Sequence, residues 1–316
     1  MKSVIQSDLQ DLRNNARLRA KMAYFTQEER DILLRSFPNG IIALDLETTG
    51  LSPLIDKVIE LSAIKVTPYG EEVFDELIDP QIDIPQFTID IHGITNDMVQ
   101  GKRTLDQVLP EFINFIGSLP LVAHNAKFDL GFIVFGMHQN KLPLGESHIY
   151  CSCKFSRYAL RGCTNFKLAT LTKELEIPLE NHHRALDDAI ACLKVFERGL
   201  KVFKKPDRKI LNEAYLFKVK DFSKQEDFEI PKKLKPLQDK VKGQEMIEIK
   251  YRGGSLKNQF RPVRPISFLP MPQGNMLYAH CLVSNMYKSF SLKKITELRE
   301  LSEDQKNELK EKMEKK

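Results

Sequence analysis

The chain has 316 residues, of which 42% are hydrophobic and 29% are charged. This length exceeds the usual size of a single hydrophobic core, and the composition excludes a wholly disordered chain, so we expect one full domain and a smaller one. No apolar run reaches the roughly 18 to 20 residues that cross a bilayer, and the first residues lack the pattern of a signal peptide. We therefore expect a cytoplasmic protein that does not enter a membrane.

The charge is divided unevenly along the chain. Residues 1–200 carry 21 Lys and Arg against 27 Asp and Glu, whereas residues 201–300 carry 22 against 11. Basic charge gathered in one part of a chain is expected of a surface that meets phosphates, although a solvated basic face gives the same pattern.

The five cysteines are odd in number and irregularly spaced, which predicts reduced thiols rather than a disulfide framework. Cys151, Cys153 and Cys163 contain a C-x-C pair without a second pair, which is a poor match to structural zinc spacing.

Residues 1–37 contain scattered apolar positions and neither Gly nor Pro, which predicts an N-terminal helical extension. Pro38 to Gly40 end this segment, and the apolar run from Ile41 to Leu44 predicts a buried strand. A second strand is expected from Lys57 to Val66.

Helices and strands then alternate. We expect a helix at Phe112–Ile116, a buried strand at Leu121–Ala123 and a helix at Lys127–Phe135. From Arg184 to Val202 the apolar residues recur at helical spacing and predict an amphipathic helix. Residues 38–203 are therefore expected to form one α/β domain.

The rest of the chain differs in composition. Residues 204–240 are rich in Lys, Asp and Glu and contain three prolines, which predicts a charged linker. Residues 241–301 are expected to form a small all-β module. Its short β-type runs lie at Met246–Tyr251, Leu277–Val283 and Lys288–Leu292. Residues 302–316 are expected to form a frayed helix or tail.

Two acids stand at the end of the first predicted strand. Because side chains alternate along a strand, Asp45 and Glu47 project from the same face. Two carboxylates on one face of a buried strand are costly without a cation, and a divalent metal with oxygen ligands compensates them. The alternative is a strand end that emerges into solvent.

A third acid, Asp129, follows the strand at Leu121–Ala123. Asn125 is a candidate N-cap, which places Asp129 near the positive end of the following helix. Complementation of the helix dipole is the alternative role of Asp129. Phe128 lies on a stripe of aromatic residues that we interpret mainly as core.

The last group is His182 to Asp188. On a helical projection Asp188 shares a flank with small and apolar residues, whereas Asp187 shares one with basic residues. Asp188 is therefore predicted to be semi-buried and Asp187 to be a solvated helix charge. His183 stands just outside the start of this helix, five residues before Asp188, where an imidazole can move and titrate. A structural role is the alternative for a lone histidine.

Together these positions carry a resemblance. D-x-E-T-T-G at 45–50, H-N-A-x-F-D at 124–129 and H-R-A-x-x-D at 183–188 resemble the three motifs of the DEDDh 3′-to-5′ exonuclease family. That family includes the proofreading epsilon subunit of bacterial DNA polymerase III and the exonuclease domain of the Gram-positive replicative polymerase. The resemblance also covers Val58–Leu61 and Ile91–Thr95.

The resemblance implies a ribonuclease H-like fold with a mixed central sheet. It assigns Asp45, Glu47, Asp129 and Asp188 to a site for two Mg²⁺ or Mn²⁺ ions and makes His183 the general base. In addition, it implies that Thr48, Thr49 and Gly50 approach the terminal nucleotide, with Asn125 and Phe128 as weaker candidates for substrate contact.

A second resemblance concerns the basic module. Residues 241–301 resemble the WYL domain, a small Sm-like β-barrel linked in bacteria to the sensing of nucleotides or nucleic acid. Leu277-Tyr278-Ala279 stands in place of the naming triplet. Arg261, Arg264 and three lysines (Lys288, Lys293 and Lys294) are predicted to contact phosphates, with Tyr251, Tyr278 or Tyr287 available for stacking. Tyrosines in a core and solvated basic residues are the alternative.

The resulting hypothesis is a DNA exonuclease that acts on a single-stranded 3′ end in proofreading, repair or end-trimming, with a separate polymerase or repair protein as a possible partner. An RNA exonuclease is the nearest alternative, because the same acids cleave both polymers. A non-catalytic regulator that binds nucleic acid through the β-module is an alternative from a different class.

Overall fold

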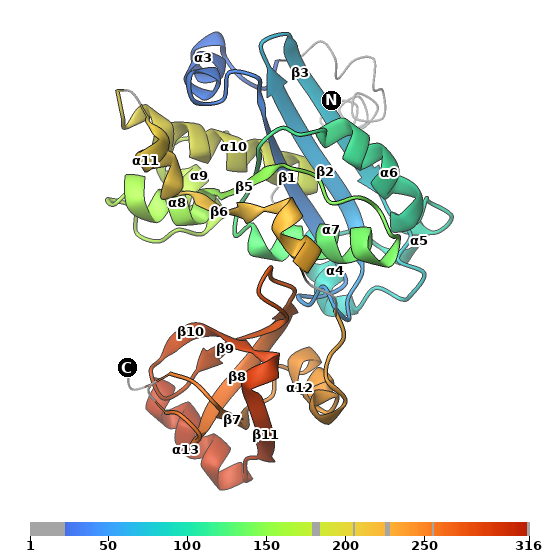
Figure 1. Ribbon diagram of the computed structural model, residues 1–316, viewed down its shortest axis with the longest axis vertical. Coiled ribbons are helices and arrows are strands. Elements are labelled where there is room, and N and C mark those ends of the chain that lie inside the picture. Colours follow the sequence, from blue (N-terminus) through green and yellow to red (C-terminus); the bar gives the residue numbers. More distant parts are fainter. Residues whose placement is uncertain (1–22, 179–183, 205, 225–227, 255, 315–316) are drawn as a thin grey trace, which may run out of the picture.

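The computed structural model describes residues 23–178, 184–204, 206–224, 228–254 and 256–314. These residues form two sheets, one in each of two parts of the molecule (Figure 1). The first part contains the expected acids, and the second lies below it in the view of Figure 1.

The first sheet, sheet A, has the order β3-β2-β1-β4-β5-β6. Its strands are β1 (Ile41–Thr48), β2 (Val58–Thr67), β3 (Gly70–Leu77), β4 (Leu121–Ala123), β5 (His148–Cys151) and β6 (Tyr215–Lys218). β1 pairs antiparallel with β2 and parallel with β4, and β4 pairs parallel with β5. The mixed central sheet expected from the sequence is therefore confirmed.

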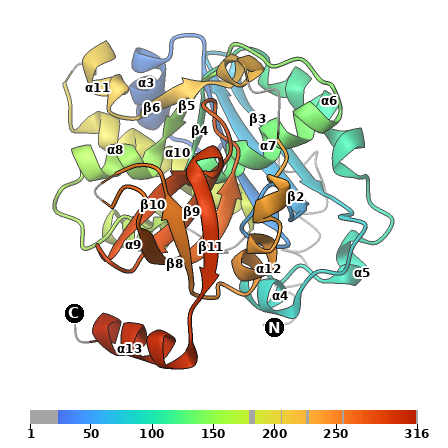
Figure 2. The same cartoon turned by 60° about the horizontal axis from the view of Figure 1, so that its bottom comes forward.

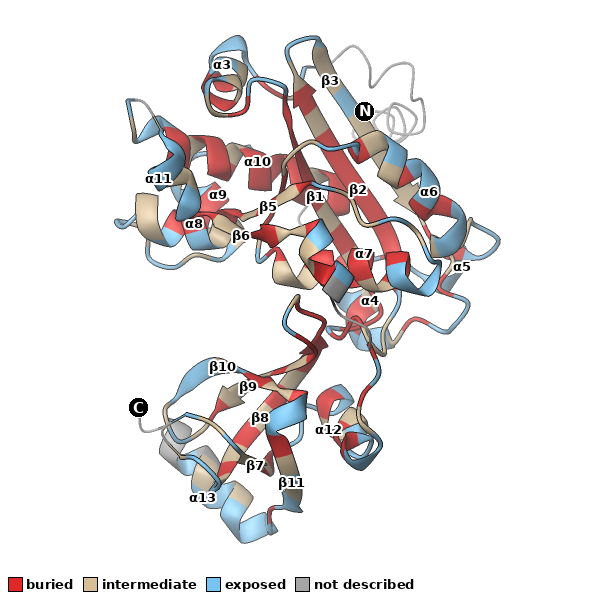
Figure 3. Ribbon diagram, in the orientation of Figure 1, coloured by how far each residue is buried: buried red, intermediate tan, exposed pale blue. Residues whose placement is uncertain are grey.

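Helices cover both faces of sheet A. One face packs against α6 (Leu105–Ile116) and α7 (Lys127–Gln139), and the other against α10 (Ala185–Lys201) together with α3 (Gln27–Ser36) and α8 (Ser152–Ala159). β1 and β2 are buried almost throughout (Figure 3), because a central strand covered on both faces must be apolar. Shorter helices complete this part: α4 (Gln86–His92), α5 (Asn96–Val99), α9 (Leu168–Glu174) and α11 (Arg208–Asn212).

The predicted N-terminal extension at 1–37 lies outside the described residues as far as residue 22. The described remainder is part of the first domain rather than an appendage, because Phe25 and Leu33 are buried in the core that α10 shares with β1. The backbone N–H of Phe25 also donates to Glu71 on β3.

The range 204–240, expected as a charged linker, differs from that expectation. It contains the edge strand β6, and it divides its apolar side chains between the two parts. Phe217, Phe222 and Phe228 enter the core under α7, whereas Leu234 and Leu237 enter the core of the second part. The charged composition masked these scattered apolar residues, whose burial fixes the segment in place.

The second part contains an antiparallel sheet, sheet B, with the order β10-β9-β8-β7-β11. Its strands are β7 (Ile247–Tyr251), β8 (Phe260–Leu269), β9 (Met276–Cys281), β10 (Met286–Ser291) and β11 (Ile295–Glu300), and helix α12 (Leu237–Lys242) packs on it. The 3-10 turn Leu292–Lys294 leads from β10 to β11, which pairs with β7 at the other edge. Sheet B is therefore open across the described residues, and the closed Sm-like barrel predicted from the sequence is not observed.

Strand β8 was not predicted from the sequence, because its prolines were interpreted as breaks between strands. Pro265 is tolerated in this central strand because the ladder with β9 shifts register between Pro265 and Ser267, as at a bulge.

The second part touches the first through the end of β8. The backbone N–H of Phe268 donates to Oγ of Ser52, at 3.0 Å. A Cβ atom at Gly131 on α7 would lie 2.9 Å from Pro53 and 3.4 Å from Pro270, so this close approach requires glycine. Viewed from below, sheet B lies in front of the first domain, with α13 (Glu303–Glu314) extending away from it (Figure 2). None of the described helices is long and apolar enough to cross a membrane.

Candidate active site

The acid pair on β1 lies as the alternation of the strand predicts. Asp45 and Glu47 are half-buried, whereas the intervening Leu46 is buried against α7 on the opposite face. Because β1 and β4 are parallel, their carboxyl ends meet at the same edge of sheet A. The site is assembled at this edge.

Asp129 lies in the first turn of α7, directly after the short connection from β4, and is 2% exposed. Its carboxylate accepts hydrogen bonds from its own backbone N–H and from that of Leu46 on β1. The predicted N-cap is wrong: Ala126 occupies the cap position, and Asn125 is an exposed residue with φ of 66°. Asn125 tolerates this left-handed conformation, which turns the chain from β4 into α7.

Asp188 lies in the first turn of α10 and is 9% exposed, so it is the more buried of the two aspartates, as predicted. Asp187, expected to be a solvated helix charge, is half-buried instead. One oxygen from each of Asp45, Glu47 and Asp188 lies within 4.8 Å of the other two. Asp129 adjoins this group, since its charge acts on Asp45 more strongly than that of any other acid. Four acids far apart in sequence thus converge, and this set is named the acid cluster.

Burial and mutual repulsion perturb the acid cluster. Burial raises the pKa of Glu47 to about 8, with Glu60, Asp188 and Asp129 adding to the effect. Burial likewise raises the pKa of Asp129 to about 7, against the hydrogen bonds from the backbone N–H groups, and that of Asp45 well above its usual range. Without a cation these carboxyl groups retain protons near neutral pH.

The donor set fits a hard divalent cation. All four side chains offer carboxylate oxygens, the ligands that Mg²⁺ and Mn²⁺ prefer, and no thiol or imidazole belongs to the group identified among the described residues. A bound cation would favour the ionised acids and oppose the effect of burial on their pKa.

An ion pair with one buried partner holds α10 against the sheet. Glu60 on β2 is 1% exposed and lies opposite Glu47 in the β1–β2 register. It accepts from Nε and Nη2 of Arg184 at 3.1 and 2.5 Å, and from the backbone N–H of Ala185 at 2.9 Å. This contact joins the start of the helix that carries Asp188 to the strand beside the acid cluster.

Glu60 and Arg184 received no role in the sequence analysis beyond the family pattern. An acid inside the apolar run of β2 is the signal that could have identified Glu60, because a buried carboxylate requires a partner.

His124 links the loop after β4 to two neighbouring segments. Its Nδ1 lies 2.8 Å from Oγ of Ser152 and its Nε2 lies 2.9 Å from the carbonyl oxygen of Phe166. Burial lowers the pKa of His124 to about 4, so it is neutral at physiological pH. With the ring neutral, Nε2–H donates to the carbonyl of Phe166, which ties the loop after β4 to the loop before α9.

Hydrogen bonds tie the loop after β1 to itself and to the start of β2. The side chain of Thr48 donates to the carbonyl of Gly50 at 2.6 Å, and Oγ1 of Thr49 accepts from the backbone N–H of Lys57 at 2.9 Å. A Cβ atom at Gly50 would lie 2.6 Å from the carboxyl group of Asp56. The side chains of both threonines are thus committed within the loop, and their role in binding substrate stays a prediction.

Three more residues were predicted to act on substrate: Phe128, His183 and Arg264. Phe128 packs edge-to-face on Phe132 with ring centroids 5.2 Å apart, at the border of the core. His183, the predicted base, and its neighbour His182 lie outside the described residues. Arg264 on β8 is half-buried.

Arg261 is not on the basic surface where the sequence placed it. It is 3% exposed and pairs with Ile249 of β7 on the inner face of sheet B. Its guanidinium lies 5.4 Å from the ring centroid of Phe290 and 5.9 Å from that of Tyr251. The expectation of an exposed phosphate contact is therefore wrong for Arg261, because the strand phase turns it inward with Val263.

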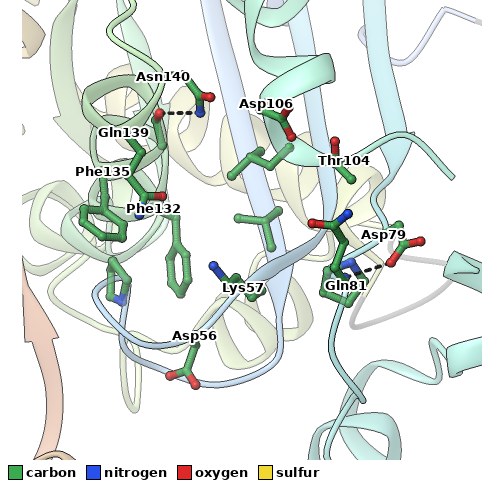
Figure 4. A pocket seen from close by; sticks show the side chains of 15 residues that line it. Asp56, Lys57, Asp79, Gln81, Thr104, Asp106, Phe132, Phe135, Gln139 and Asn140 are labelled. Carbon is green, nitrogen blue, oxygen red and sulfur yellow. Dashed lines mark hydrogen bonds between the residues drawn. The ribbon is translucent and has the colours of Figure 1, made fainter.

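A cavity of about 250 Å³ lies away from the acid cluster. It is lined by the start of β2, the start of α6 and the far end of α7, including Lys57, Thr104 and Gln139 (Figure 4). None of the four acids of the cluster lines it.

The fold and the acid cluster define an α/β protein with an acidic centre suited to divalent cations. Residues 42–196 match the exonuclease family RNase_T. The DNA polymerase III PolC-type of Clostridium perfringens is 40% identical over 190 residues, which are 57% of this chain and 13% of that protein. The match thus spans a small fraction of the curated relative.

Two solved structures are also similar. Exonuclease X in complex with 5′ overhanging duplex DNA has 25% identity and a TM-score of 0.42, over 55% of this chain and 98% of that chain. The nuclease domain of 3′hExo, a DEDDh family member bound to rAMP, has 21% identity and a TM-score of 0.46, over 52% and 92%. The region that matches the exonuclease family, residues 42–196, contains all four residues of the acid cluster.

Proposed function

We propose that this chain is a divalent-metal-dependent 3′-to-5′ exonuclease that hydrolyses terminal phosphodiester bonds of DNA and releases nucleoside 5′-monophosphates. The observation that carries the proposal is the convergence of Asp45, Glu47 and Asp188 within 4.8 Å, with Asp129 beside them. The polymerase relative favours DNA as the substrate. We further propose a role in proofreading, repair or end-trimming beside a separate polymerase or repair protein in the cytoplasm.

Each residue of the site has a role in this proposal. Asp45, Glu47, Asp129 and Asp188 hold two Mg²⁺ or Mn²⁺ ions, which when bound supply positive charge to the attacking and leaving oxygens. Glu60 and Arg184 hold the start of α10, and so Asp188, in register with β1. His183 takes a proton from the attacking water, because an imidazole with a pKa near 6.5 titrates close to neutral pH.

The rest of the proposal concerns binding. The backbone of Thr48 to Gly50, together with Asn125 and Phe128, contacts the terminal nucleotide of a single-stranded 3′ end. The module at 241–301, which resembles the WYL domain, engages nucleic acid through its basic residues; the inward Arg261 is not one of them.

The test is incubation with single-stranded DNA, duplex DNA and RNA, each labelled at the 5′ end or at the 3′ end, in Mg²⁺, Mn²⁺ or EDTA. We expect the 3′ label to be released first as a mononucleotide from DNA, and only with a metal. Faster release of the 3′ label from RNA than from DNA would show that RNA is the substrate. Binding without cleavage under every metal condition would contradict the proposal and favour a non-catalytic regulator.

A further inference from the structure

Sheet B exposes a row of aromatic rings. On β9, Leu277, Ala279 and Cys281 face the core, so Tyr278 and His280 face outward. Tyr287 on β10 stacks beside both: its ring centroid lies 5.8 Å from that of Tyr278, at an interplanar angle of 20°, and 4.9 Å from that of His280. Tyr287 is 63% exposed, so most of this residue is open to solvent beside its two neighbours.

The row continues onto the first domain. Tyr278 packs at the edge of the core that α7 shares with β1, although it belongs to the second part. Cys153 of α8 packs against the same core as Tyr278, and Arg157 lies one turn further along α8, where its charge acts on the Tyr278 phenol. Arg157 in turn lies 5.0 Å from the ring centroid of Phe166.

Phe166 joins the row to the loop that follows β4. Its carbonyl oxygen lies 2.9 Å from Nε2 of His124, in the loop that leads from β4 to Asp129. We name Arg157, Phe166, Tyr278, His280 and Tyr287 the aromatic strip. The strip therefore runs from the loops beside the acid cluster across the junction to the edge of sheet B.

We infer that the aromatic strip binds the single strand of nucleic acid whose 3′ end lies at the acid cluster, with bases stacked on its rings. This inference rests on the proposed function and deepens it. Bases stack on aromatic side chains without regard to sequence, which suits a strand whose sequence varies. DNA and RNA share this chemistry.

The charge around the strip matches a polynucleotide. Arg264 on β8 lies opposite His280 in the ladder, so Arg264, His280 and Tyr287 form one row across three strands. Residues 201–300 carry twice as many basic as acidic residues. A strand held here stays bound after its last nucleotide is removed, so the strip predicts release of several nucleotides in each encounter.

The test compares Tyr287→Ala with Tyr69→Ala. Tyr69 is 99% exposed and lies in the turn between β2 and β3, at the end of sheet A away from the second part (Figure 1). Binding of long oligothymidylate and oligouridylate is measured in EDTA, so that the strand stays intact. Tyr287→Ala should weaken binding of at least one polymer about tenfold, the loss of one stacked base, with Tyr287→Phe and Tyr69→Ala unchanged.

Affinities for both polymers that equal the wild-type values would overturn the inference. Whether Tyr287→Ala weakens binding of oligothymidylate, of oligouridylate or of both shows whether the strip accepts deoxyribose, ribose or both. Wild-type hydrolysis of the p-nitrophenyl ester of thymidine 5′-monophosphate, which is too small to span the strip, tests the proposed function separately. A wild-type protein that binds oligonucleotides through Tyr287 yet never hydrolyses this ester would leave the strip in place and contradict the nuclease.

Discussion

Sheets A and B both bury charge, but in opposite ways. Sheet A gathers carboxylates of one sign at one edge, where burial raises the pKa of Glu47 to about 8 and that of Asp129 to about 7. Sheet B buries the single guanidinium of Arg261 between two aromatic rings, with no acid against it among its described ion pairs. Repulsion between the carboxylates adds to the cost of burying the acid cluster. The ring faces offset only part of the cost of burying Arg261, because its buried Nε and Nη2 have no hydrogen-bond partner among the described residues.

The two sheets therefore differ in the sign of the charge that they bury. The motifs assign the acid cluster to nucleic-acid chemistry and the charge count assigns the second part, and only in the acid cluster does repulsion between like charges add to the cost of burial. Substitutions that remove charge from each sheet should therefore have different consequences for activity and for stability.

The largest expected effect is on catalysis. Asp45→Asn should lower the rate of nucleotide release at least about a thousandfold, because it removes several kcal/mol of charge stabilisation from the transition state. The same change should raise the melting temperature of the metal-free protein, since it relieves repulsion within the acid cluster. Rates on end-labelled DNA and thermal melts in EDTA measure both, with Asp187→Asn on α10 as the control. Parental activity in a folded Asp45→Asn protein would refute the site.

The ion pair beside the acid cluster gives the next effect. Arg184→Ala leaves the buried Glu60 without its guanidinium and should cost about 2 kcal/mol of unfolding free energy, less than for a fully buried pair because Arg184 is partly in water. Denaturant unfolding measures this loss. Arg103→Ala, which removes surface pairs with Glu76 and Glu111, is the control and should cost less than about 1 kcal/mol.

A double-mutant cycle tests whether Glu60 and Arg184 act together in positioning α10. Glu60→Gln with Arg184→Ala should lose less stability than the two single changes added together, and the pair should share its effect on nucleotide release. Additive losses would show that Glu60 and Arg184 act separately and would remove the ion pair from the proposed site.

The stability of the metal-free protein should depend on pH, and a bound metal should oppose that dependence. The folded protein raises the pKa of Asp45, Glu47 and Asp129, so between their unfolded values and about 8 the folded state binds more protons. Stability of the metal-free protein should therefore fall as pH rises through this window, and added Mg²⁺ should restore it most at high pH. Melting curves from pH 5 to pH 9 check this. A change with pH that is unaltered by Glu47→Gln would contradict it.

The sequence predicted the elements with the simplest environments. β1, β2, β4 and α10 are covered by other elements and so carry apolar runs or a clear helical period. β3 and β6 are edge strands of mixed character, and β8 contains prolines, so no regular pattern marked them. Local composition also concealed the apolar residues of 204–240.

Site residues were predictable where the periodicity of a single strand or helix determines which way their side chains point. Alternation along β1 placed Asp45 and Glu47 together, and helical phase chose Asp188 over Asp187. The pairing of Glu60 with Arg184 joins residues 124 positions apart, which no local pattern reveals. Arg261 was misplaced because a charge count gives no direction, although its phase with the buried Val263 pointed inward.

The smallest effect is expected in sheet B and compares two arginines of the same strand. Arg261→Met keeps the length of a buried side chain, removes its charge and should change the unfolding free energy by less than about 1 kcal/mol, because apolar groups replace buried charge at little cost. It should leave oligonucleotide affinity unchanged. Arg264→Ala, in the row with Tyr287, should instead lower the slope of log affinity against log salt by about one, as for one lost phosphate contact. A salt slope reduced by Arg261→Met and untouched by Arg264→Ala would reverse the roles of the two residues and make the inner face of sheet B the ligand site.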